Sequence, residues 1–124
     1  MLKIVIKGKP VPKKRPRTVR SGGRTRTYTP KVTKDAEERI RMIAWAEMKK
    51  QGIGIITGDV SAEICFYGAN PAADIDNLLK TVLDGLNGTA FADDKQVTRL
   101  VVSKDPSEDP RTTIKVSEGK NDIR

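Results

Sequence analysis

The chain has 124 residues and a formal net charge of +8, from 24 Lys and Arg against 16 Asp and Glu, with no His. This length predicts a single domain over residues 1–124, and the lack of His excludes Ser-His-Asp triads, HExxH zinc sites and His-based nucleases. The single cysteine, Cys65, can form neither an intramolecular disulfide nor a Cys-rich zinc site. No segment has the length and apolar character of a signal peptide or membrane span, so we expect a soluble cytoplasmic protein with no membrane partner.

The positive charge is concentrated at the beginning of the chain. Residues 1–34 contain twelve basic and no acidic residues, whereas residues 35–124 contain the other twelve basic residues and all sixteen acidic ones. The sequence therefore divides into a basic arm of charge +12 and a body of charge −4. A concentrated basic segment is typical of proteins that bind nucleic acid.

The first predicted element is a strand over residues 1–7, where Ile4, Val5 and Ile6 form a short β-branched run. Residues 8–30 contain four prolines, a Gly-Gly pair and eight Lys or Arg residues, a composition that argues against a regular element. We expect a long basic loop there. Loops of this length in compact domains are usually functional or disordered.

The next element is a helix whose start is indicated by Thr29 at the N-cap and Pro30 at the first helical position. Apolar residues then recur at spacings of three and four up to about residue 50, and Gly52 is typical of a helix end. A turn at Asn70-Pro71 separates the elements that follow. These are a strand over 59–68, a helix over about 76–87, strands over 97–102 and 112–116, and a frayed tail over 120–124. This order predicts an α+β domain with a mixed sheet and two main helices.

Acidic residues gather in two short motifs, DIDNLLK from residue 74 and ADDKQV from residue 92. If Asp74 is extended and Asp76 caps the second helix, both carboxylates can converge at one point. Lys80 lies one turn beyond Asp76 on the same helix face, so its ammonium group can reach the same place. A third carboxylate, from Asp93 or Asp94, could complete the cluster.

Three carboxylates held together repel one another, and a hard divalent cation is the usual reason for such a cluster. Mg²⁺ takes oxygen ligands and leaves positions for water and substrate phosphates, and it can activate water without a histidine base. Lys80 could stabilise negative charge in the transition state or orient the attacking water. The acidic motifs and the basic arm together favour a metal-dependent enzyme acting on a polyanion.

Simpler interpretations remain open. An Asp at a helix start is most often a cap, an Asp pair before a strand is most often a turn, and Asp84 is expected to be a solvated residue. The chain could then be a non-catalytic nucleic-acid-binding protein whose affinity falls with salt. RNA is a further candidate ligand for the arm.

The string DIDNLLKTVLDGLNG followed by ADDKQV resembles the signature of the RusA-type Holliday junction resolvases, small endodeoxyribonucleases of bacteria and their phages. The opening IKGKPVPKKRPR resembles that family's first strand and basic loop, so the resemblance covers nearly the whole chain. It implies a homodimer that binds four-way or other branched DNA and resolves it by paired nicks in recombination and repair. It also implies a bacterial, phage or prophage origin.

The resemblance implies roles for particular residues as well. Asp74, Asp76 and Asp94 match the family's ligands for Mg²⁺ or Mn²⁺, Lys80 matches the essential catalytic lysine, and Asn77 has a supporting or capping role. This chain has Pro-Ala-Ala over 71–73, where family members often carry arginines. The basic loop is therefore expected to carry more of the DNA binding. The expected DNA contacts are Lys13, Lys14, Arg15, Arg17, Arg20, Arg24 and Arg26.

Overall fold

A computed structural model describes residues 1–119, so the predicted frayed tail over 120–124 lies outside the described residues. The elements in chain order are β1 (Leu2–Lys7), β2 (Arg17–Ser21), β3 (Arg24–Tyr28), α1 (Lys31–Gln51), β4 (Val60–Tyr67), α2 (Ile75–Leu86), the 3₁₀ turn η1 (Asp94–Gln96), β5 (Val97–Asp105) and β6 (Arg111–Glu118). The predicted single α+β domain with a mixed sheet and two main helices is confirmed.

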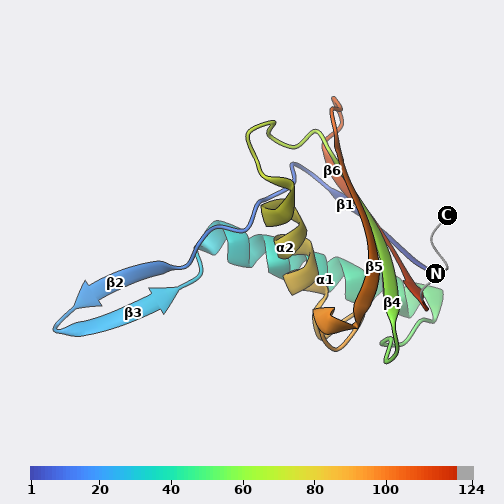
Figure 1. Ribbon diagram of the computed structural model, residues 1–124, viewed down its shortest axis with the longest axis horizontal. Helices are drawn as coiled ribbons and strands as arrows, with labels where there is room; N and C mark the ends of the chain where they lie inside the picture. The colour runs from blue at the N-terminus through green and yellow to red at the C-terminus, as the bar shows by residue number, and fades with distance from the viewer. Residues whose placement is uncertain (120–124) are drawn as a thin grey trace.

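Four strands form the main sheet in the order β1-β6-β4-β5. Strand β6 pairs antiparallel with both β1 and β4, whereas β4 and β5 are parallel and are joined through α2. Both helices lie against the same face of this sheet (Figure 1). The start of α2 and the turn before β5 therefore both lie on the connection between the parallel strands β4 and β5.

The core lies between the sheet and the two helices. In β1 the side chains alternate strictly, so Leu2, Ile4 and Ile6 are buried while the residues between them are exposed. Ile40 of α1 and Leu78 of α2 are buried in the same cluster. Complete burial of such a side chain contributes about 1.5–3 kcal/mol, so this cluster fixes α2 on the sheet.

The two helices approach closely at Gly85, in the last turn of α2. A Cβ atom at this position would lie 2.8 Å from Ile40 Cγ2 and 3.0 Å from the Glu37 carbonyl oxygen. Only glycine permits this separation without displacing α1. Gly85 therefore sets the distance between α1 and the helix that carries the acidic motif.

The predicted loop over 8–30 is wrong for residues 17–28, which form a separate two-stranded hairpin. Gly22 and Gly23 connect its strands with φ angles of 57° and 77°. Two consecutive left-handed residues make the tight turn that suits the twist of a hairpin. Figure 1 shows β2 and β3 extending from the body beyond the N-terminal end of α1.

The predicted start of the first helix is displaced by one residue. Pro30 occupies the N-cap position with an extended backbone, α1 begins at Lys31, and no side chain caps it. Thr29 is therefore outside the helix. The predicted end is confirmed, because Gly52 adopts a left-handed conformation with φ 69° and its N–H bonds to carbonyls of the last turn. Strands β5 and β6 are both longer than predicted.

Candidate nuclease site

The two aspartates of the first motif lie at the start of α2. Asp74 is the N-cap residue with an extended backbone, but its side chain makes no capping hydrogen bond. Asp76 lies in the first turn, where its Oδ1 accepts a bond of 3.0 Å from the Asn77 N–H. The expectation that Asp74 is extended is confirmed, whereas Asp76 occupies the first turn rather than the cap. Both carboxylates are exposed at the positive end of the helix dipole.

Lys80 and Asn77 follow on the same helix. Lys80 is exposed, one turn beyond Asp76. Asn77 is half-buried, and its carbonyl oxygen accepts bonds from the Lys13 N–H at 2.8 Å and the Thr81 hydroxyl at 3.4 Å. The backbone of Asn77 thus ties the segment before the hairpin to the first turn of α2.

The second motif forms the short turn η1, in which Asp93 and Gln96 have structural roles. Asp93 Oδ1 accepts a bond of 3.1 Å from the Lys95 N–H, and Gln96 Oε1 accepts one of the same length from the Asp93 N–H. This reciprocal pair is a capping box. Gln96 Nε2 also donates to the carbonyls of Ile56 at 2.8 Å and Gly58 at 2.9 Å, which fixes the turn against the preceding loop.

Asp94 makes a different set of interactions from its neighbour. A hydrogen bond shared with Asp93 raises the pKa of Asp94, and partial burial and the Asp93 and Asp84 charges add to the rise, while the Lys80 charge opposes it. The pKa of Asp93 is lowered, chiefly by the bond from the Lys95 N–H. The pKa of Asp94 thus responds to charges of both signs on α2, those of Lys80 and Asp84, besides that of its neighbour.

Within residues 1–119, no group of three or more His, Cys, Asp or Glu side chains is gathered closely enough to hold a metal ion. The structure thus does not collect Asp74, Asp76 and Asp94 into one cluster. The donor set still fits a hard divalent cation, because it consists only of carboxylate oxygens.

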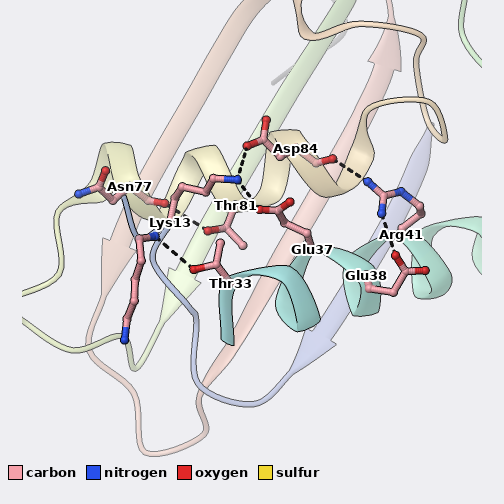
Figure 2. A network of polar contacts seen from close by, with 9 residues as sticks. Lys13, Thr33, Glu37, Glu38, Arg41, Asn77, Thr81 and Asp84 are labelled. Atoms are coloured by element: carbon pink, nitrogen blue, oxygen red, sulfur yellow. Dashed lines mark hydrogen bonds and ion pairs between the residues drawn. The ribbon is translucent and has the colours of Figure 1, made fainter. Parts of the chain in front are cut away.

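Lys13 lies between the two helices rather than on the surface (Figure 2). Its Nζ is 2.6 Å from Glu37 Oε2 of α1 and 3.1 Å from Asp84 Oδ2 of α2. Burial lowers the pKa of Lys13, but the hydrogen bonds and charges of Glu37 and Asp84 outweigh this effect, so the net shift is upward. Among the expected DNA contacts whose side chains the structure describes, Lys13 is the one whose charge is paired inside the molecule.

Asp84 differs from the solvated residue that the sequence suggested. Besides its ion pair with Lys13, its carbonyl oxygen accepts a bond of 3.1 Å from Arg41 Nη2 of α1 (Figure 2). Arg41 also pairs with Glu38 at 2.9 Å. These contacts join α1 and α2 along the side of α2 that faces away from the sheet.

The segment before Asp74 is held by a lysine that sequence reasoning missed. Lys104 Nζ of β5 donates to the carbonyl of Pro71 at 3.1 Å and to that of Ala73 at 2.7 Å. A cation from β5 is thus used to fix the backbone just before the first aspartate. No local signal in the sequence identifies this contact, because Lys104 and Ala73 are thirty-one positions apart.

The other expected DNA contacts lie on the hairpin and the segment leading to it. Lys14, Arg15, Arg20, Arg24 and Arg26 are all exposed. Arg17 is the first residue of β2, and its side chain lies outside the described part of the structure. The Lys14 N–H donates to Thr33 Oγ1 of α1 at 3.2 Å, so the base of the hairpin is fixed to both helices. In the described part of the chain, no helix is long and apolar enough to cross a membrane.

Comparison with known proteins agrees with this arrangement. "Uncharacterized protein YqaN" of Bacillus subtilis (strain 168) is 29% identical to this chain over 139 aligned residues, which cover 94% of this chain and 96% of YqaN. The family model described as "Endodeoxyribonuclease RusA" matches residues 7–117, a span that includes the hairpin, both helices, both acidic motifs, strands β4 and β5, and all of β6 except its last residue. Membership of that family implies endodeoxyribonuclease activity. The chain belongs to the RusA endodeoxyribonuclease family.

Proposed function

We propose that this protein is a Mg²⁺-dependent, structure-specific endodeoxyribonuclease that resolves four-way DNA junctions by paired symmetric nicks. The observation that carries the proposal is the placement of Asp74, Asp76 and Lys80 along one exposed stretch at the start of α2, in a chain that belongs to the RusA endodeoxyribonuclease family. In addition, Asp93 performs the capping, which leaves Asp94 available.

We assign the cation to Asp74, Asp76 and Asp94, with Mn²⁺ as a substitute for Mg²⁺. When bound, such a cation polarises a phosphodiester and lowers the pKa of bound water. Lys80 places a positive charge beside these carboxylates, where it can stabilise the negative charge that develops on the phosphate oxygens. Asn77 supports the site through its backbone, because its carbonyl holds the segment before the hairpin against α2.

The DNA contacts are assigned to Lys14, Arg15, Arg24 and Arg26, which are exposed. Arg20 projects from the opposite face of the hairpin to Arg24 and Arg26 and is not assigned one. The charge of the assigned residues suits the DNA backbone, and release of counterions gives such contacts a strong dependence on salt. The segment over 71–73 has no basic side chain, and the ammonium group of the nearby Lys104 is bonded to its backbone carbonyls. This supports a larger part for the hairpin in holding the DNA.

A homodimer is part of the proposal. Two opposed nicks in a four-way junction require two equivalent sites, and C₂ symmetry supplies them. Sedimentation equilibrium at working concentration should give twice the chain mass of 13.7 kDa. A single-chain mass under those conditions, together with symmetric cleavage, would remove the dimer from the account.

A cleavage assay with Lys80 variants tests the proposed function. A synthetic four-way junction with a label on each strand should give paired nicks in Mg²⁺ and none in EDTA. Lys80→Ala should lower the single-turnover rate about 10² to 10³-fold while metal binding, followed by calorimetry, is retained. Cleavage in EDTA at the same rate would contradict the metal requirement, and no cleavage at any metal concentration would favour the non-catalytic nucleic-acid-binding alternative.

A further inference from the structure

The two faces of the β2–β3 hairpin differ in character. Residues directly opposite each other in an antiparallel pair project from the same face, and the register pairs Val19 with Arg26, and Ser21 with Arg24. We call this the arginine face; the members whose side chains the structure describes are Val19, Ser21, Arg24, Arg26 and Tyr28. The opposite face, the threonine face, carries Thr18, Arg20, Thr25 and Thr27.

The threonine face has a clear structural role. Thr18 and Thr27 lie opposite each other, with their hydroxyl oxygens 3.5 Å apart. Cross-strand threonine pairs of this kind stabilise a hairpin. A two-stranded hairpin is at best marginally stable by itself, so the contribution of this face to the hairpin is needed.

The described side chains of the arginine face form no such cross-strand pair. Its five residues line a hollow of about 600 Å³. Residues 18–28 are all exposed, and within the described residues no ion pair involves Arg24 or Arg26. The hollow therefore combines two uncompensated guanidinium groups with the side chains of Val19 and Tyr28, which are 43% and 40% exposed.

We propose that the arginine face of the hairpin binds the sugar-phosphate backbone of a double-stranded DNA arm, at a distance from the scissile phosphate. The inference rests on the proposed function, since it assigns one part of the substrate to one surface. Guanidinium groups bind phosphate by paired N–H donors. Positions 24 and 26 are about 6.8 Å apart along the strand, and phosphates recur at about 3.4 Å along the axis of each DNA strand, so the two groups can contact separate phosphates.

Tyr28 and Val19 give this face apolar surface between the charges. A phenol ring offers a flat surface to deoxyribose and a hydroxyl group for hydrogen bonding. The hairpin extends away from the sheet beyond the start of α1 (Figure 1), so it can follow a duplex arm that leaves the body of the protein. Because the base of the hairpin is fixed to both helices, the direction of that arm is set relative to α2.

Salt-dependent binding of single-arginine variants tests this assignment. Anisotropy of a labelled four-way junction is measured in EDTA over a series of salt concentrations for wild type, Arg24→Ala, Arg26→Ala and Arg20→Ala. Arg20→Ala is the matched control, because the substitution removes the same charge from the same hairpin but from its threonine face. Arg24→Ala and Arg26→Ala should each reduce the magnitude of the slope of log K against log salt by about 0.9. With affinities that converge at an extrapolated 1 M salt, each variant should bind about eightfold more weakly than wild type at 0.1 M.

Tyr28→Ala should weaken binding without changing the slope, and Arg20→Ala should change both quantities much less than Arg26→Ala. Thermal unfolding of all variants should match wild type, because the hairpin makes no part of the core. Three results would overturn the assignment. They are an Arg20→Ala effect equal to that of Arg26→Ala, unchanged slopes for both arginine-face variants, and a loss of affinity in these variants that is larger for single-stranded than for duplex DNA.

Cleavage by the wild type separates this inference from the proposed function. If the wild type nicks the junction in Mg²⁺ while the arginine-face variants bind as it does, the hairpin assignment is wrong and the nuclease stands. If the variants lose affinity as expected while the wild type does not nick, the hairpin assignment stands and the nuclease proposal fails.

Discussion

Replacing Lys13 by Met removes the cation that lies between α1 and α2. Its side chain is 18% exposed, and those of Glu37 and Asp84 are 16% and 23% exposed. The substitution keeps most of the aliphatic length but leaves two carboxylates facing each other with little water. We expect the folded state to be destabilised.

The size of the loss follows from the burial of the three groups. Removing one partner of a fully buried ion pair costs about 3–5 kcal/mol, and hydrogen bonds to charged groups are worth about 1.5–3 kcal/mol. Since about a fifth of each side chain remains exposed, water can partly solvate the orphaned carboxylates. We therefore expect a loss of about 2 kcal/mol, or a fall in Tm of about 8 °C for a domain of this size.

Differential scanning calorimetry at pH 7 measures this fall, with Lys31→Met as the control. Lys31 pairs with Asp35 at 2.8 Å, a similar distance, but the two side chains are 88% and 62% exposed. Exposed pairs contribute little, so Lys31→Met should leave Tm almost unchanged. Adding Glu37→Gln and Asp84→Asn to Lys13→Met should recover much of the loss, because the uncompensated charges are removed. Equal Tm values for the two single variants would refute the reasoning.

Three further outcomes are expected. Gly85→Ala should lower the free energy of unfolding by about 1–3 kcal/mol in urea, because its Cβ would overlap Ile40; Gly54→Ala, whose Cβ would meet nothing within 4 Å, is the neutral control. Gln96→Ala should cost about 1–2 kcal/mol, because two backbone carbonyls lose their donor, and a wild-type urea midpoint would contradict that role. The raised pKa of Lys13 means that its stabilisation is complete below pH 10.5 and is lost as pH rises through the folded-state pKa. The Tm difference between wild type and Lys13→Met should thus shrink at pH 11, and a difference unaffected by pH would contradict the assignment.

The elements that contribute to the hydrophobic core were predictable from sequence, because burial of one face imposes a periodic spacing on their apolar residues. The alternation over residues 1–7 and the apolar spacing over 30–50 both report contact with the same cluster. The hairpin over 17–28 has no buried face, so no period marks it, and its charge and flanking prolines resemble those of a loop. One signal was present, since the Gly22-Gly23 pair separates two runs rich in Thr, Val and Tyr.

The sequence was enough to identify the candidate site residues but not the contacts that they make. The motif spacing identified Asp74, Asp76 and Lys80 on one helix end, and the structure places them there. The different roles of Asp93 and Asp94 depend on the capping box with Gln96, which a pair of adjacent aspartates does not reveal. The contacts of Lys13 and Lys104 join residues from separate elements, and only the tertiary fold brings them together.

Cleavage of a four-way junction by Asp76→Asn tests the central claim most directly. The amide keeps the size of the side chain and removes the charge proposed to hold the cation, and Asp35→Asn on α1 removes an exposed carboxylate outside the site as a control. In Mg²⁺, Asp76→Asn should bind the junction as tightly as wild type but nick it at least about a hundredfold more slowly. Asp35→Asn should nick at the wild-type rate. Nicking by Asp76→Asn at the wild-type rate would contradict the account.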